Sequence, residues 1–328
     1  MIVVSLATLA VVHPVAPPQY AVVRSIPVGG DGGWDCIRID GKSHRLFISR
    51  GTHVMVLDVN DGKLVGDIPN TNGVHDIALV PKLGKGYISD GRDNSVTVFD
   101  LKTLQQTKQI AVGQRPDVMA YDPSTNRVLS FNGGSEDSSI IDPTTDSVVG
   151  TVKLDGKPEF GCPDGRGNVF VNLEDKSAID KIDMKTLKVT GTWSLAPGEG
   201  PTGLAVDPKR GLLFSACDNG MMAVSDVKTG KIVATPKIGN GPDGAGFDPG
   251  TGLAFSPNGR DGTVTIIGKD FSVLQTVTTQ RGARTMTLDP ASHTLYLIAA
   301  KYEDAQPGTR PRMVPGSAAI VVLAPVAK

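Results

Sequence analysis

Short apolar segments alternate with polar, glycine-rich turns along almost the whole chain, and this alternation is periodic. An apolar strand that ends in Asp-Pro, or in a variant of that pair, recurs seven times. The intervals between successive copies are 40, 42, 42, 43, 41 and 41 residues, counted at Asp40, Val80, Asp122, Asp164, Asp207, Asp248 and Asp289. Self-similarity at so steady a period indicates a repeat architecture.

Every copy has the same internal order of strands. A short apolar strand such as 203–206 precedes the Asp-Pro turn, and a second strand such as 213–216 follows it. A polar loop leads to a third strand that ends in Asp, and a turn such as 226–231 opens a fourth strand rich in Val, Ile and Thr. Asp, Asn, Gly and Pro favour turns because they fix φ, tolerate positive φ or cap the turn with a side chain. Four antiparallel strands in about 40 residues describe one blade of a β-propeller.

The last copy predicts how the ring closes. After 319–323 only 324–328 remain, so the seventh blade lacks an outer strand. The segment 20–28 has the length and composition of that strand, and pairing the two would remove both exposed edges. The sequence therefore predicts an all-β fold, a single seven-bladed β-propeller over residues 20–325. Its blade repeats are expected at about 34–73, 74–114, 115–156, 157–200, 201–241, 242–282 and 283–323, with the closing strand at 20–28.

These features resemble the YncE-like, or YVTN-repeat, family of bacterial propellers. The resemblance rests on second strands such as Val169-Phe170-Val171-Asn172 and on the Asp-x-x-Thr-Gly-Lys turn at 226–231. It implies a seven-bladed propeller and an exported protein, because members of the family are often exported. Related seven-bladed propellers include lactonases and cycloisomerases, and no motif in this chain places it among them.

Composition narrows the class of partner. The 328 residues include 33 basic and 34 acidic residues, so we expect no nucleic-acid partner, which would normally require a basic domain. Three cysteines cannot all pair and imply no disulfide framework. Residues 1–12 form an apolar run that resembles the core of a signal peptide without its charged start. We interpret 1–19 as the remnant of an export signal, with a disordered tail as the alternative.

That apolar run is too short to cross a bilayer as a helix, so no transmembrane span is expected. Export would place the protein in the periplasm or outside the cell, as a monomer, with an envelope protein as a further candidate partner.

Candidate chemistry gathers at one position of the repeat. Five residues before each repeat mark, at the start of the inner strand, stand Asp35, His75, Asp117, Glu159, Thr202, Asp243 and Arg284. Two places further on, the copies turn apolar or small. Because closure of the ring brings these positions together, we expect them at one mouth of the central channel. Crowded carboxylates repel, so a bound cation or shared protons must relieve them.

Two interpretations of this ring stay open. In the functional one Asp35, His75, Asp117, Glu159 and Asp243 hold a divalent metal: carboxylates suit Ca²⁺ or Mg²⁺, and the histidine extends the choice to Zn²⁺, Mn²⁺ or Fe²⁺. In the structural one each acid accepts hydrogen bonds from backbone N–H groups of neighbouring strands. Arg115 and Lys157, two residues before a ring acid, are candidates to pair with the ring locally.

Further polar side chains fall in the loops between second and third strands, on the same face. They are Arg50, His53, Arg92, Asp93, Asn132, Asn172, Glu174, Cys217, Asn258 and Lys301. Cationic residues around an acidic centre suit an anionic small-molecule ligand, so Arg50, His53, Arg92, Asn132, Asn172 and Lys301 are the candidate ligand-binding residues. The blade-seven loop 301–317 is several times longer than its counterparts and is a candidate lid over the mouth.

Three functions compete. The leading one is an exported binding propeller that holds a small ligand or a metal ion at the channel mouth. The rival is a metal-dependent hydrolase or lactonase, in which His75 or a ring carboxylate is the general base and Arg284 steadies the oxyanion. The third is an interaction scaffold without chemistry. No P-loop, dinucleotide fingerprint, haem motif or nucleophile elbow occurs, so we expect no nucleotide, haem or flavin cofactor.

Overall fold

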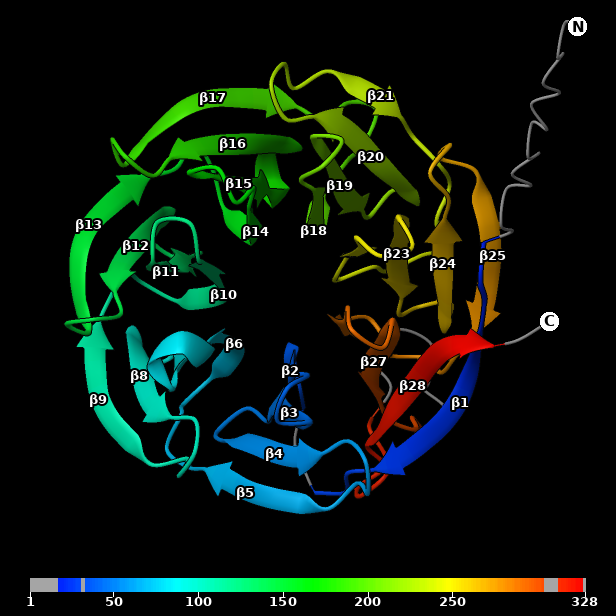
Figure 1. Cartoon of the computed structure of the whole chain (residues 1–328), viewed down its shortest axis with the longest axis horizontal. Coiled ribbons are helices and arrows are strands. Elements are labelled where there is room, and N and C mark those ends of the chain that lie inside the picture. Colours follow the sequence, from blue (N-terminus) through cyan, green and yellow to red (C-terminus); the bar gives the residue numbers. More distant parts are fainter. Residues whose placement is uncertain (1–16, 31–32, 304–311, 327–328) are drawn as a thin grey trace, which may run out of the picture.

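The computed structural model describes residues 17–30, 33–303 and 312–326. It shows seven four-stranded antiparallel sheets arranged as the blades of a ring, which confirms the seven-bladed β-propeller (Figure 1). Within the described residues the only helices are two single-turn 3₁₀ segments, η1 (Pro81–Leu83) and η2 (Glu174–Lys176), and none is long or apolar enough to cross a membrane. The predicted signal remnant lies mostly in 1–16, outside the described residues.

Six blades run outward from the channel in chain order, and the seventh does so for three strands before β1 completes it. Blades one to four consist of β2 (Ile37–Asp40), β3 (Arg45–Ser49), β4 (Val54–Asp58), β5 (Leu64–Ile68); β6 (Val74–Val80), β7 (Lys85–Asp90), β8 (Ser95–Asp100), β9 (Gln106–Ala111); β10 (Pro116–Asp122), β11 (Arg127–Asn132), β12 (Asp137–Asp142), β13 (Ser147–Lys153); and β14 (Pro158–Pro163), β15 (Asn168–Leu173), β16 (Ala178–Asp183), β17 (Lys188–Ser194). Blades five to seven consist of β18 (Pro201–Asp207), β19 (Leu212–Cys217), β20 (Met221–Asp226), β21 (Ile232–Ala234); β22 (Gly246–Asp248), β23 (Leu253–Asn258), β24 (Thr263–Ile267), β25 (Val273–Thr278); and β26 (Met286–Asp289), β27 (Thr294–Ala299), β28 (Ala319–Val326), β1 (Gln19–Pro27).

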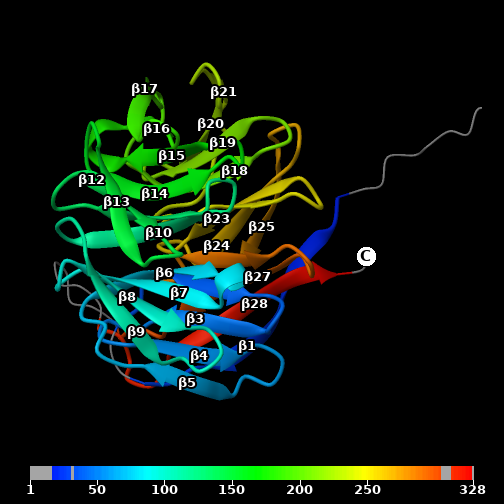
Figure 2. The ribbon, with the colours of Figure 1, turned by 60° about the vertical axis from the view of Figure 1, so that its left-hand side comes forward.

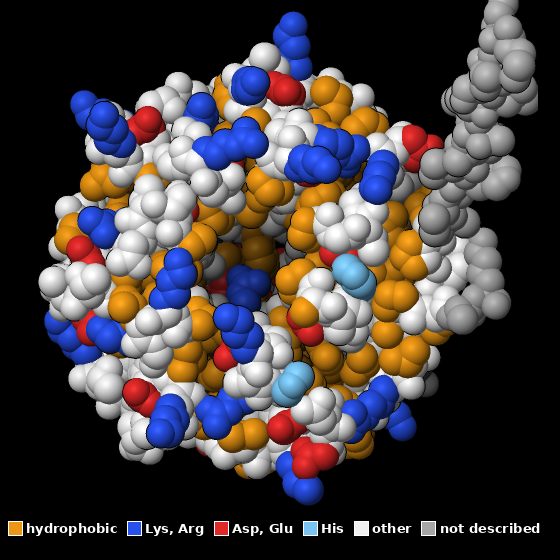
Figure 3. All heavy atoms as spheres, viewed as in Figure 1, with side chains coloured by type: hydrophobic (Ala, Val, Ile, Leu, Met, Phe, Trp, Pro, Cys, Tyr) orange, Lys and Arg blue, Asp and Glu red, His pale blue; other side chains and the backbone are white. Residues whose placement is uncertain are grey.

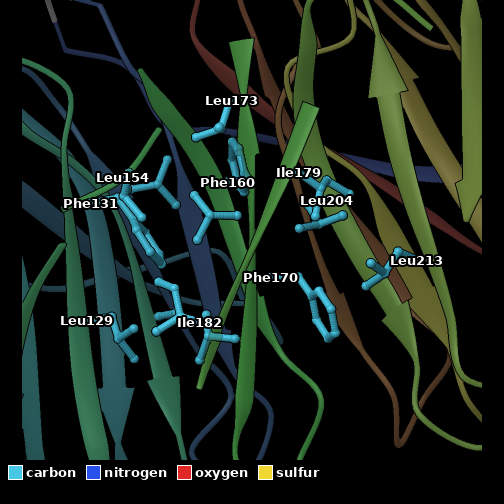
Figure 4. Packing of buried hydrophobic residues seen from close by; sticks show 14 of the residues in the cluster. Leu129, Phe131, Leu154, Phe160, Phe170, Leu173, Ile179, Ile182, Leu204 and Leu213 are labelled. Carbon is cyan, nitrogen blue, oxygen red and sulfur yellow. The ribbon is translucent and has the colours of Figure 1, made fainter. Parts of the chain in front are cut away.

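Burial along the strands explains why blades stack into a ring. Second strands such as β19, β23 and β27 are buried at every position, whereas the outer strand β17 alternates between exposed and half-buried residues. A fully buried strand needs cover on both faces, and only neighbouring blades supply it. Around blade four, Phe131, Phe160 and Phe170 belong to one such core between blades (Figure 4).

The N-terminal strand completes the seventh blade, as the sequence predicts. β1 pairs antiparallel with β28, with Gln19 opposite Val326 and Pro27 opposite Ala319. Both views place the two strands side by side at the outer edge of the blade (Figure 1 and Figure 2). Buried Tyr20 anchors the strand, because its hydroxyl donates to the backbone oxygen of His293 at 3.1 Å and its ring packs against Phe255, with 5.3 Å between centroids. The ring is therefore closed by hydrogen bonds between the two ends of the chain.

Hydrogen bonds between adjacent blades fix the channel. The Ser89 hydroxyl donates to the backbone oxygen of Asp117 at 2.5 Å, and the Thr285 hydroxyl donates to that of Asp35 at 2.7 Å, across the junction of blades seven and one. Thr202 likewise donates to the backbone oxygen of Pro242 at 3.1 Å. The space-filling view shows the ring hollowed at its centre, with basic and acidic side chains inside the hollow (Figure 3). The backbone at the predicted ring positions is thus held in place by the neighbouring blades.

Candidate functional site at the channel mouth

Three side chains from the first three blades converge at the channel mouth. His75 Nδ1 lies 2.6 Å from an oxygen of Asp35 and 3.5 Å from an oxygen of Asp117. One ligand atom from each of the three residues fits within 4.8 Å of the others, a spacing that a single divalent ion can bridge. The other two predicted metal ligands, Glu159 and Asp243, are outside this group and have cationic partners of their own.

Arg284 and Lys157 complete the network of charges. Arg284 Nε donates to Asp243 at 2.7 Å, and its terminal nitrogen reaches Asp35 at 3.5 Å. On the opposite side, Lys157 Nζ lies 2.9 Å from Glu159, so one of the two expected local partners does pair with the ring. Arg115 is exposed and makes no ion pair with a described residue. The six charged residues at the predicted ring position therefore do gather at one place.

Burial makes the ionised form of the mouth carboxyl groups less favourable. Burial raises the pKa of Asp117 and of Glu159, and it raises the pKa of Asp243 to about 7, with further repulsion from Asp35. The hydrogen bond that His75 donates to Asp35 raises the pKa of His75, which favours the imidazolium form in the absence of a metal. None of the four mouth acids accepts a backbone N–H from a described residue, so the structural interpretation of the ring is not seen in the form expected. Only side chains neutralise them.

A buried ion pair that the sequence did not predict lies next to the mouth. Asp76 is fully buried, pairs with Arg38, and accepts the backbone N–H groups of Ile77 at 2.7 Å and Met119 at 3.0 Å. Burial raises the pKa of Asp76 in spite of these donors. Asp76 follows His75 directly, and the residues at that offset in other blades (Cys36, Val118, Phe160, Gly203) share no polarity that could have marked it.

A cavity of about 500 Å³ opens beside the mouth between blades four to seven. Its polar and aromatic lining consists of Glu174, Thr202, Asp218, Asp243, Arg260, Arg281, Arg284 and Tyr302. This volume lies in the range of small-molecule sites. Three of these residues, Thr202, Asp243 and Arg284, stand at the predicted ring position. The cavity also contains two cations from outside that position, Arg260 and Arg281.

Arg260 and Arg281 were missed, although the repeat contains a signal for Arg260. Gly91-Arg92-Asp93 and Gly259-Arg260-Asp261 are the same triplet in the same loop of blades two and six. In both loops the Gly and Arg N–H groups donate to the preceding interblade loop, at 3.0 and 3.2 Å in blade two and 2.9 and 3.1 Å in blade six. Aligning the loops as well as the strands would have identified Arg260 beside Arg92.

The predicted ligand-binding residues have different surroundings. Arg50, Asn132 and Asn172 are buried; Arg50 donates to the backbone oxygen of Gly29, and Asn132 braces its own hairpin through Asp137 and Ser139. The Asn172 amide donates to the backbone oxygens of Thr202 and Gly203, at 3.0 and 3.1 Å. These three side chains make structural contacts within the protein, and none of them lines the mouth cavity.

The remaining loop residues are more accessible. His53 lies 3.7 Å from Asp67 in a separate surface hollow, and Arg92 and Lys301 are exposed. Cys217 and Asn258, also expected in these loops, are buried. The described base of the long blade-seven loop reaches the mouth, because Tyr302 lines the cavity and pairs with Met313 in an isolated β-bridge. Its central part, 304–311, lies outside the described residues, and the lid stays a prediction.

Comparison with known proteins supports the fold and leaves the family open. No family model matches the chain. Antigen Lp49 of Leptospira interrogans is 33% identical over 96 residues, which covers 27% of this chain and only 21% of the relative. A chain of the Kuenenia stuttgartiensis hydrazine synthase superposes with a TM-score of 0.72 and 18% identity, covering 81% of this chain and 92% of that one. At that identity the likeness concerns the propeller fold alone.

Proposed function

We propose that this chain is an exported propeller of the YncE-like type that binds a small anionic ligand at the channel mouth. The observation that carries the proposal is the cavity of about 500 Å³ in which Arg260, Arg281 and Arg284 meet. Guanidinium groups bind carboxylate and phosphate oxygens through paired N–H donors. Arg284 is paired with Asp243, whereas Arg260 and Arg281 make no ion pair with a described residue, so these two favour an anion.

The mouth cluster supports a second, metal-dependent candidate. Asp35, His75 and Asp117 have the spacing for one divalent ion, and Arg284 beside them would steady a developing oxyanion in a hydrolase or lactonase. The neighbouring carboxylates raise the pKa of His75, so a proton competes with a metal ion for its ring nitrogen. Metal binding would have to displace that proton, so it would weaken as the pH falls.

Calorimetric titration with small mono-, di- and tricarboxylates and phosphate esters tests the proposal. We expect at least one class to bind, and Arg281→Gln to weaken it by about tenfold, the loss of one charge-assisted contact. Arg92→Gln is the matched control, since Arg92 has the same loop geometry as Arg260 but lies outside the cavity. If no anion binds, or if Arg92→Gln weakens binding equally, the scaffold interpretation replaces this one.

Elemental analysis before and after chelation distinguishes the metal-dependent candidate from the anion-binding proposal. A stoichiometric ion that Asp35→Asn and Asp117→Asn each remove would support the hydrolase or lactonase. Protein that contains no ion, and that takes up none from added Zn²⁺, Mn²⁺ or Ca²⁺, would exclude that candidate and leave the anion-binding proposal intact.

A further inference from the structure

The charges that line the mouth cavity are not all compensated within the protein. Arg284 is paired with Asp243 at 2.7 Å, and Glu174 is paired with Lys157. The other three charged residues of the lining, Arg260, Arg281 and Asp218, make no ion pair or side-chain hydrogen bond to another described residue. The lining therefore offers two uncompensated positive charges and one uncompensated negative charge.

These three charges come from different walls of the cavity. Asp218 follows β19 in blade five, on the same side as Glu174 of blade four. Arg260 follows β23 in blade six, and Arg281 stands before the inner strand of blade seven, next to Tyr302. Because blades five, six and seven are consecutive in the ring, the acid lies at one end of the lining and the arginines toward the other. A ligand that spans the cavity meets both signs of charge.

Glycines form the surface against which the cavity side chains pack. A Cβ at Gly241, where φ is +68°, would come within 2.5 Å of Arg260 Cγ. A Cβ at Gly259 would come within 2.5 Å of Arg284 Cβ, and one at Gly282 within 2.8 Å of the Tyr302 ring. The stems of Arg260 and Arg284 and the tyrosine ring thus lie directly on backbone. Such close packing limits the rotamers of these side chains, which lowers the entropy lost when a ligand binds.

From this arrangement we propose that the ligand is a small amino acid with a second acidic group. Its two carboxylates pair with Arg260 and Arg281, and its ammonium group pairs with Asp218. The ligand's net charge is then opposite to the uncompensated charge of the lining, and no charged group of either partner is left without a counter-ion. This inference rests on the proposed function and adds to it the class of ligand.

Three probes of similar length test the assignment by calorimetry. Glutamate carries both carboxylates and the ammonium, glutarate lacks the ammonium, and 4-aminobutyrate lacks one carboxylate. We expect glutamate to bind about tenfold or more tightly than either of the others, since each lacks one charged contact. In Asp218→Asn, glutamate should fall to the affinity of glutarate while glutarate stays unchanged.

Variants of the basic end give the complementary readout. Arg281→Gln and Arg260→Gln should weaken glutamate and glutarate by similar factors, and Arg92→Gln should weaken neither. Gly259→Ala, which displaces Arg284 without removing a charge, tests whether the position of the cavity wall matters. Melting temperatures of all variants establish that each is folded.

The outcomes separate this inference from the proposed function. If glutarate binds wild-type protein as tightly as glutamate, or if Asp218→Asn leaves their ratio unchanged, the amino-acid assignment is wrong and the anion-binding proposal stands. If none of the three binds while another organic anion does, the same conclusion holds. If no anion of any class binds folded protein, both fail.

Discussion

Aspartates at the turns of this propeller and aspartates at its channel mouth come from the same repeat, yet their partners differ in kind. In the turns the donors are local: the Asp122 carboxylate accepts the N–H and hydroxyl of Ser124 at 2.9 and 2.7 Å, and Asp226 accepts the N–H groups of Lys228 and Thr229 at 3.0 and 2.9 Å. Bonds from Thr229 hold the pKa of Asp226 below its usual value. At the mouth the partners are side chains from other blades, and burial raises the pKa of Asp117 and Asp243.

The difference separates acids that build the fold from acids that are retained for another reason. A turn aspartate stabilises the folded state because its ionised form gains hydrogen bonds. A mouth aspartate loses water and gains a neighbouring negative charge, so its ionised form costs stability. Sequences keep such residues where function requires them and compensate elsewhere. Four experiments test this division.

The largest effect is expected at Arg38, whose removal leaves Asp76 without the cation that pairs with it. Arg38→Met should lower the free energy of unfolding by about 3 kcal/mol at pH 8, since an unpaired buried carboxylate is left behind. The pKa of Asp76 is already raised, so a fall in pH lets this acid take up a proton and should recover part of the loss. Denaturant unfolding at pH 5 and pH 8 measures both. The double variant Arg38→Met with Asp76→Asn is the control, and a loss independent of pH would contradict the assignment.

A smaller loss is expected in the turns. Asp226→Ala removes bonds to Lys228 and Thr229 and should cost about 1 kcal/mol at pH 7. The folded-state pKa of Asp226 is lowered, so its stabilisation is present above the unfolded pKa and is lost as the pH falls through the folded value. The gap between wild type and variant in urea unfolding should therefore narrow in acid. Asp226→Asn retains an acceptor and should cost less; equal costs would argue against the turn bonds.

Asp90 is an acid at a position that blades three and six fill with asparagine. Asn132 and Asn258 donate from this position to residues of the next strand, whereas one oxygen of buried Asp90 finds no donor among the described residues. Burial raises the pKa of Asp90 to about 7, so its ionised form costs stability as the pH rises from the unfolded value toward 7. Asp90→Asn should gain about 1 kcal/mol at pH 8 and little at pH 4. Thermal melts between pH 4 and pH 8 measure this difference in stability. An Asp90→Asn variant less stable than wild type at pH 8 would contradict the view that ionised Asp90 costs stability.

The smallest effect is expected at the mouth itself. With a chelator present, Asp117→Asn should raise the free energy of unfolding by about 0.5 kcal/mol at pH 8, because it removes one of several crowded negative charges. The pKa of Asp117 is raised, so the gain should shrink as the pH falls and the wild-type acid becomes protonated. A variant less stable than wild type at pH 8 would mean that Asp117 belongs with the structural acids of the turns.

The blades and the ring closure were predictable because both follow from local composition. Asp-Pro turns recur at a fixed period, and the unpaired segment before the first blade matched the strand missing from the last. The charged residues at the mouth were predictable from the repeat as well. Residues at one repeat position in different blades meet around the channel when the blades form a ring. Repeat position alone was therefore enough to predict that Asp35, His75 and Arg284 lie close together.

Side-chain direction was not predictable in the same way. Asn132 and Asn172 were expected to face a ligand, but Asn132 bonds to Asp137 and Ser139 of the next strand and Asn172 to the backbone of the next blade. Hairpin register and interblade distance decide these contacts, and neither is visible in one repeat. Arg281 was not identified because it stands in an interblade loop before the aligned ring position, and Tyr302 was expected only as part of the candidate lid 301–317.

The pairing of β1 with β28 also determines when, during synthesis, the propeller ring can close. The strand that begins at Gln19 can pair only after the residues opposite it, 319–326, have been synthesised. Some 300 residues separate the two, and at roughly 5–20 residues per second that delay is roughly 15–60 s. Throughout that interval the nascent chain carries an open edge strand with Tyr20 unburied. Synthesis of β28 is therefore the event that allows the ring to close, and a chain terminated before that strand would remain open.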